Sequence, residues 1–386
     1  MLKRGESKGS LKPKLKKQDT GGELSMLPDI IGEEGVSSMV LKRIEVARKS
    51  GKLDLAGMSL AHIPNAAMDL GESARVVWLQ DNELTAIPKS IQQWAVVTQL
   101  KLGNNKIQSI PEEIGNCVSL SMILIHDNHL VHIPDTITHC KALSILDIRN
   151  NRMVRIPVFL ALLPQLTDLQ VDNNPLEFPH KRVVSQGKMN LLKYLRRFTD
   201  ARRTRKLNLT GVGQYELPPE VAYIGERLVE IDASDLYKQG GISLPFELGS
   251  CPNLAVCKLS PTLQILSPPE SVSKQGIKAI VEYLARFRKS QTEGRLDLRG
   301  LELDDLPPEI NDTKQLEPKL VKTFIITDNK IQALSTGLGM MQNLEELHVG
   351  GNMIRTLPAS LAKLKLLRLL DADRNMISEV SHQVRA

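Results

Sequence analysis

The sequence is poor in aromatic residues and cysteines, and it has no long apolar run. Phe, Trp and Tyr make up 3% of the 386 residues, which argues against a globular core built around rings. Four cysteines give no sign of a secreted disulfide framework, and we expect reduced core thiols. No run of about 18 apolar residues could span a bilayer, and the N-terminus lacks the apolar segment of a secretory signal. These absences predict a cytoplasmic protein filled by aliphatic side chains.

Signatures of the common catalytic sites are also missing. The sequence contains no GxxxxGK[ST] loop, no HExxH pair and no GxSxG turn, which are the local signatures of nucleotide hydrolysis, zinc proteolysis and serine esterase chemistry. We therefore predict a protein that is not an enzyme and that carries no cofactor.

The sequence instead contains a repeat. An asparagine returns every 23 residues, at Asn82, Asn105, Asn128, Asn151 and Asn174. Around each one the chain fits LxxLxLxxNxLxxIPxxIxxLxx, which is typical of a leucine-rich repeat. The LxL segment predicts a short strand with its leucines inward, and the Asn amide can pair with buried turn groups that no strand reaches. One copy cannot bury its apolar face alone, so the copies must stack.

Two helical inserts divide the chain into three blocks of repeats. The pattern SQG…YLRRF…KLNLTG…LPPEV, which begins at Ser185, recurs 89 residues later as KQG…YLARF…RLDLRG…LPPEI, and the 23-residue spacing returns at Asn329, Asn352 and Asn375. We predict a disordered basic tail at 1–36 and an N-terminal capping helix at 37–52. Block one follows at 53–180, a helical insert at 181–203 and an irregular block two at 204–271. A second helical insert at 272–292 precedes block three at 293–386.

The predicted fold is an α/β leucine-rich-repeat solenoid, right-handed and curved, with a parallel strand ladder on the concave side. We expect the sheet to continue past both inserts, with three separate lobes as the alternative. We expect no helix to cover the apolar face of the last repeat. Either the C-terminal tail folds back over it, or a partner covers it, or the chain is a shortened relative of a longer protein.

Three stretches carry a closer resemblance: ARKSGKLDLAGMSL before the first repeat, NPL at 174–176 followed by SQG and LLKYLR, and ELHVGGNMI at 346–354. Together they resemble the intracellular leucine-rich-repeat family of leucine-rich repeat-containing protein 40, a class that also includes the Ras-binding scaffold repeats. The resemblance covers most of residues 43–380. It implies a non-catalytic intracellular binding scaffold, with no catalytic residues to carry over.

Four neighbouring histidines invite a metal interpretation. The register of the repeat argues against it, because only the first points out of the concave side and the others are spread through the turn and the convex return. We therefore predict no metal site at His126, His129, His132 and His139.

The concave sheet is the surface that such solenoids use for recognition. Its outward positions include five apolar residues, Val76, Trp78, Met122, Leu124 and Ile145, where solvent would be the default. An exposed Trp among aliphatic neighbours resembles an interface hot spot with a polar rim, although scattered apolar residues also occur without a partner. The predicted contact set is completed by Lys101, His126, Asp147 and Arg149.

The basic charge of the first insert suggests an alternative function, the binding of a polyanion. Residues 181–206 hold ten Lys and Arg against one acid, Asp200. Without a reader motif or interleaved aromatics, a solvated helix face is favoured over a nucleic-acid or membrane-surface site. A polyanion would be held through Arg196, Arg197, Arg202 and Arg203. The preferred hypothesis remains a scaffold for a protein partner, either a small GTPase or a larger assembly.

Overall fold

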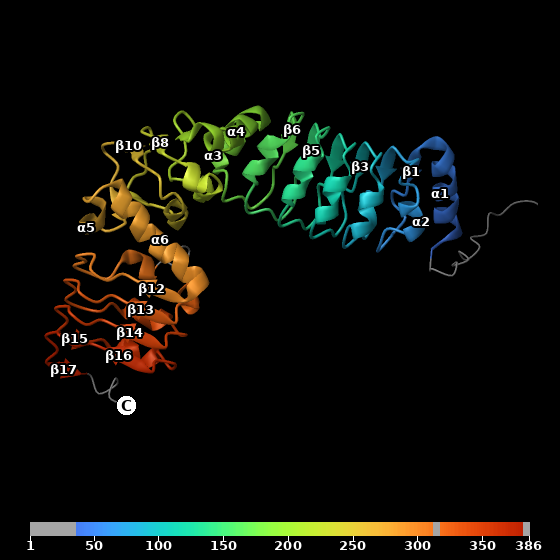
Figure 1. Cartoon of the computed structure of the whole chain (residues 1–386). Helices are drawn as coiled ribbons and strands as arrows, with labels where there is room; N and C mark the ends of the chain where they lie inside the picture. Colours follow the sequence, from blue (N-terminus) through green and yellow to red (C-terminus); the bar gives the residue numbers. More distant parts are fainter. Residues whose placement is uncertain (1–35, 312–316, 381–386) are drawn as a thin grey trace, which may run out of the picture.

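The computed structural model describes residues 36–311 and 317–380, and these form a curved solenoid that bends at block two (Figure 1). The predicted disordered tail therefore falls almost wholly outside the described residues. None of the helices in the two described ranges has the length and apolar character needed to cross a bilayer.

Block one is built on a parallel sheet of six strands in sequential order. Each strand has three residues, and its central side chain is fully buried because alternate side chains point to opposite faces. The strands are β1 (Lys52–Asp54), β2 (Val76–Trp78), β3 (Gln99–Lys101), β4 (Met122–Leu124), β5 (Ile145–Asp147) and β6 (Asp168–Gln170). The predicted solenoid with a parallel strand ladder is confirmed.

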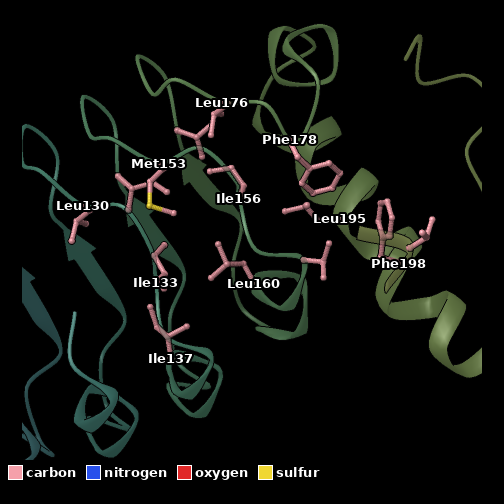
Figure 2. Packing of buried hydrophobic residues seen from close by; sticks show 14 of the residues in the cluster. Leu130, Ile133, Ile137, Met153, Ile156, Leu160, Leu176, Phe178, Leu195 and Phe198 are labelled. Atoms are coloured by element: carbon pink, nitrogen blue, oxygen red, sulfur yellow. The ribbon is translucent and has the colours of Figure 1, made fainter. Parts of the chain in front are cut away.

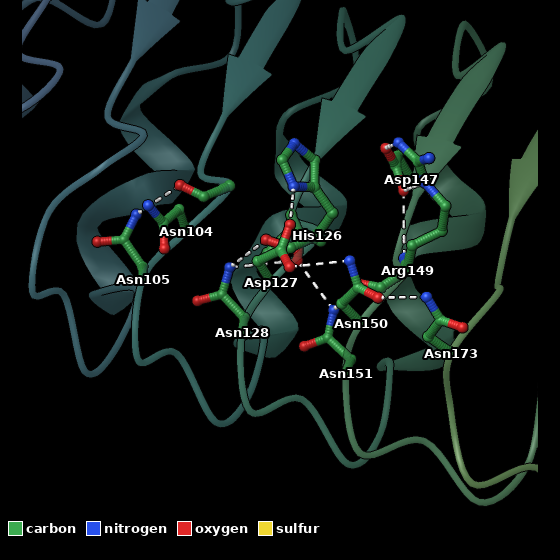
Figure 3. Close-up of polar contacts among 12 residues, drawn as sticks. Asn104, Asn105, His126, Asp127, Asn128, Asp147, Arg149, Asn150, Asn151 and Asn173 are labelled. Atoms are coloured by element: carbon green, nitrogen blue, oxygen red, sulfur yellow. Dashed lines mark hydrogen bonds and ion pairs between the residues drawn. The ribbon is translucent and has the colours of Figure 1, made fainter.

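The repeated asparagines form a buried ladder along the turns (Figure 3). Asn128 Oδ1 accepts from the backbone N–H of Ile107 at 2.9 Å, and its Nδ2 donates to three carbonyl oxygens, those of Leu102, Ile125 and His126. The other ladder asparagines make equivalent bonds with the repeat before them. This pairing satisfies backbone groups that lie beyond the ends of the strands, as the template predicts.

Three helices begin the three blocks. They are α1 (Ser38–Ser50), α4 (Lys188–Thr204) and α6 (Ile277–Glu293). Ser37 caps α1, which buries Val40, Ile44 and Ala47 against the first strand. Short helices α2 (Asn65–Met68), α3 (Lys181–Ser185) and α5 (Glu270–Ser273) accompany them. The returns on the convex side are short 3-10 turns, such as η3 (Asp135–His139) and η4 (Val158–Leu162), and a Pro with extended backbone precedes most of them.

The sheet does not continue past the inserts, so that expectation is wrong. Block two has its own sheet of β7 (Lys206–Asn208), β8 (Glu230–Ala233) and β10 (Val256–Leu259), and block three has another of β12 (Arg295–Asp297), β13 (Thr323–Ile325), β14 (Glu346–His348) and β16 (Leu369–Asp371). Helix α4 packs against both β6 and β7. It occupies the place where a further repeat would pair with β6. Because strands must lie within about 5 Å to share hydrogen bonds, β6 and β7 belong to separate sheets.

Two small ladders run along a side of the solenoid, outside these sheets. Strand β9 (Ile242–Ser243) pairs with β11 (Ile265–Ser267), and β15 (Thr356–Leu357) pairs with β17 (Glu379–Val380). In block one the same side holds a single parallel bridge between Arg155 and Phe178.

The blocks share one apolar core despite the breaks in the sheet. Figure 2 shows how aliphatic rows from successive repeats end against α4, where Leu195 and Phe198 cover Phe178. The rings of Phe178 and Phe198 meet edge to face at 5.7 Å. The helix therefore caps the last apolar row of block one.

The cysteines agree with the predicted core thiols at three of four positions. Cys117, Cys140 and Cys251 are buried, whereas Cys257 is half-buried. Burial raises the pKa of the Cys117 thiol to about 12 and that of Cys140 to about 11. These side chains pack as small apolar groups.

Candidate concave interface

The concave side of block one presents two rows of side chains that cross the strands. One row runs through Lys52, Val76, Gln99, Met122, Ile145 and Asp168, and the other runs through Asp54, Trp78, Lys101, Leu124, Asp147 and Gln170. The register places all the predicted apolar contact residues on this face. Each of them is half-buried rather than fully exposed, because its neighbours along the row cover its flanks.

Trp78 is held between two lysines. Lys52 Nζ lies 3.3 Å from the centroid of the Trp78 ring system, and Lys101 Nζ lies 4.3 Å from it. An ammonium over an aromatic face is attracted by the ring quadrupole. Trp78 and Lys101 belong to the contact set predicted from the sequence, whereas Lys52 does not. Its position next to Leu53 in the first LxL segment already placed Lys52 on this face.

The five apolar residues form two separate groups on the concave face. Met122, Leu124 and Ile145 are contiguous on β4 and β5. Val76 and Trp78 lie on β2 and are separated from them by Gln99 and Lys101 of β3. The surface therefore combines an aromatic patch flanked by positive charge with an aliphatic patch one strand farther along.

A row of polar residues borders these patches at the carboxyl ends of the strands (Figure 3). Arg149 donates from Nε and Nη2 to the carboxylate of Asp147 at 3.0 and 2.8 Å, and this hydrogen bonding raises the pKa of Arg149. His126 Nδ1 lies 2.6 Å from Asp127 Oδ2. Asp147 is 3% exposed, so the ion pair holds Arg149 in place as part of a polar rim.

The histidines do not converge in the part of the chain that the structure describes. His126 is on the concave side, His129 lies in the turn, and His132 and His139 are exposed along the return. No cluster of three His, Cys, Asp or Glu that could hold a metal lies within residues 36–311 and 317–380.

Two of the four arginines predicted to contact a polyanion have other partners. Arg197 donates to the carbonyl oxygens of Asn208 and Thr210 at 3.0 and 2.8 Å. The guanidinium of Arg202 lies 4.9 Å from the centroid of the Tyr223 ring. Arg196 and Arg203 are exposed and form no ion pair with any described residue. The structure thus leaves a smaller free basic surface than the sequence suggested.

Comparison with known families identifies the repeat within block three. Residues 319–377 match the family model described as leucine rich repeat. No curated protein matches the chain.

Solved structures with similar folds include a leucine-rich-repeat protein of Leptospira interrogans, with 22% identity over 90% of this chain and 95% of that one and a TM-score of 0.30. An internalin from Listeria monocytogenes shares 16% identity over 92% of this chain and 81% of that one, with a TM-score of 0.33. The plant peptide hormone receptor RGFR1, solved in complex with RGF2, shares 18% identity over 85% of this chain and 39% of that one, with a TM-score of 0.28.

Proposed function

We propose that this leucine-rich-repeat solenoid is a non-catalytic scaffold that binds a protein partner on the concave face of block one. The observation that carries the proposal is the Trp78 side chain, half-buried on a sheet face between two lysines. Trp is the residue most enriched in interface hot spots.

The surface supports a two-part contact. The patch of Met122, Leu124 and Ile145 offers apolar area that loses water when covered. Lys52 and Lys101 beside Trp78 favour an acidic group on the partner next to its apolar anchor. His126 and Arg149 provide a polar rim at the carboxyl ends of the strands, and Gln99 lies between the two patches.

The resemblance noted in the sequence favours a cytoplasmic location and a partner that is either a small GTPase or a subunit of a larger assembly.

The test is affinity purification of the tagged full-length chain, at low and high salt and with nuclease treatment. The Trp78→Ala/Leu124→Ala variant runs beside the wild type. A matched control is Val118→Ala/Val131→Ala, because both valines are 54% exposed and lie outside the strands. We expect a defined protein to co-purify with the wild type and the control at high salt and after nuclease treatment. The same protein should be lost from the Trp78→Ala/Leu124→Ala variant. Retention of that protein by the concave variant would refute the proposal.

A second candidate is polyanion binding, by nucleic acid or an acidic membrane surface, through α4. The observation in its favour is a stripe of Lys193, Arg196 and Arg203, where the matching positions of α6 are Glu282, Ala285 and Thr292. The structural role of the helix therefore does not require this charge. Arg196→Glu/Arg203→Glu should abolish salt-sensitive binding to a labelled duplex or to anionic vesicles, whereas Lys278→Glu/Arg288→Glu on α6 should not.

A further inference from the structure

A cavity of about 640 Å³ lies where block one meets block two, away from the concave sheet. The chain has only 5 Tyr and 6 Phe, yet two Tyr and one Phe line this cavity, together with a histidine and two prolines. Its walls come from three successive loops, at residues 177–180, 214–219 and 237–239. Its volume is in the usual range for a binding pocket.

The middle wall has an unpaired backbone. On this side of the solenoid the last repeat of block one is hydrogen-bonded to the repeat before it. Glu177 N–H donates to the Val154 carbonyl at 2.8 Å, and Ile156 N–H donates to the Phe178 carbonyl at 2.9 Å. Over residues 213–217 no backbone N–H or carbonyl has a hydrogen-bond partner within the described ranges. Insert helices α3 and α4 separate this loop from the repeat before it, which leaves the backbone groups of the loop unpaired.

The aromatic side chains are arranged around that run. His180 meets Tyr215 edge to face at 5.3 Å, and the Arg182 guanidinium lies 4.4 Å from the centroid of the Tyr215 ring, so this ring is fixed. Tyr237 on the opposite wall is 61% exposed. Beside it, Lys238 forms an ion pair with Glu216. The cavity therefore has one anchored ring and one freely accessible ring.

One buried polar group also lacks a partner. Gln214 lines the cavity, is 8% exposed, and its Oε1 accepts from the Tyr194 hydroxyl at 2.7 Å. Its Nε2 is buried and has no acceptor among the described residues. Such a donor costs free energy until an acceptor reaches it.

We propose that this cavity binds an extended peptide segment of a partner protein, whose main chain pairs with residues 213–217 and whose apolar or proline side chain lies between Tyr215 and Tyr237. Consecutive unpaired N–H and carbonyl groups match the main chain of an added strand, and a small rigid ligand would use few of them. The aromatic rings add contact area for one side chain. This site is separate from the concave interface and extends the proposed function to a second contact.

The probe is a phage-displayed library of random 12-residue peptides, selected on the full-length chain, with the enriched peptide then synthesised with a fluorescent label. Binding is measured by anisotropy for the wild type, Tyr237→Ala and Trp78→Ala. We expect Tyr237→Ala to weaken binding at least tenfold and Trp78→Ala to leave it unchanged. Tyr237 is exposed, so its removal should spare the fold, which a thermal melt checks.

Two further measurements address the main-chain pairing. Amide hydrogen exchange of residues 213–217 should slow when the peptide is bound. Methylation of alternate peptide nitrogens should weaken binding at least tenfold at the paired positions. Equal affinity of Tyr237→Ala and wild type, or protection that appears on β2–β5 instead, would overturn the proposal. Protection on β2–β5 would be consistent with the concave interface while it overturns the cavity as the peptide site. A library that yields no binder would overturn the proposal for the cavity and would not affect the concave interface.

Discussion

The guanidinium of Arg197 in α4 donates to the carbonyl oxygen of Asn208 in β7, 3.0 Å away and 11 residues later in the chain. The same contact recurs where the other two blocks begin, from Arg43 to Asp54 at 3.0 Å and from Arg286 to Asp297 at 3.1 Å, with the same spacing. In each block, an arginine of the helix thus donates a charge-assisted hydrogen bond to a backbone carbonyl of the first strand.

Replacement of Arg197 by Met should therefore destabilise the chain. The variant loses the bonds to Asn208 and Thr210, and we expect a fall of about 1–3 kcal/mol in the free energy of unfolding. Arg196→Met is the matched control, because that neighbour is exposed and forms no ion pair with the described residues. Denaturant unfolding of the two variants should separate them clearly. Equal stabilities would show that the contact contributes nothing.

Asn128→Ala should be among the most damaging substitutions in block one. It removes the acceptor of the Ile107 N–H and the donor to three carbonyl oxygens, all near the buried turn. Buried groups left without a partner cost about 1–3 kcal/mol each, so we expect a loss of about 3 kcal/mol or more. Asn150→Gly is the control, since Asn150 is exposed and has a φ of 53° that glycine adopts readily. A thermal melt that ranks the two alike would contradict the ladder as a source of stability.

Arg205→Gly should stabilise the protein. Arg205 follows α4 with a φ of 65°, where the equivalent residues after α1 and α6 are Gly51 and Gly294 at 71° and 69°. Relief of this left-handed conformation should raise stability by about 1 kcal/mol, less what is lost with the long hydrogen bond to Arg227. The reciprocal variant Gly294→Arg should lose at least as much. Arg203→Gly is the control: this position lies inside α4, so a glycine there should lower the melting temperature. A rise instead would show that the gain of Arg205→Gly does not come from the left-handed conformation of residue 205.

Glu220 should make stability fall as the pH rises toward neutrality. Burial raises the pKa of Glu220 from 4.5 to about 7, opposed by Arg155 at 3.1 Å and supported by the charge of Glu247. The folded state therefore holds a proton between pH 4.5 and about 7 that the unfolded state has released, so stability is lost as the pH rises through that window.

Glu220→Gln should remove this pH dependence and keep the shape of the side chain. Relative to the variant, the wild type should lose on the order of 2 kcal/mol between pH 5 and pH 8. Denaturant midpoints of both proteins across that range make the comparison. Curves that stay parallel would show that Glu220 titrates normally in the fold.

The sequence alone determined the repeat unit and its packing. The 23-residue spacing of Asn82, Asn105 and Asn128 predicted the ladder, and the LxL segments predicted which side chains point inward. These features are local, because each depends on the alternation of a strand or on one side chain that reaches the adjacent turn. The helix before each block was equally visible as a stripe of apolar residues.

Only the tertiary structure decided what happens between the blocks. The sequence shows that an insert follows Pro179, but not that α4 takes the place of a repeat and ends the sheet at β6. It shows ten basic residues, but not that Arg197 and Arg202 have partners within the chain. Two further features depend on distances between residues of different repeats. They are the contacts of Lys52 and Lys101 with the Trp78 ring, and the unpaired backbone at 213–217. Such distances are set by how the repeats stack, and no local pattern contains that information.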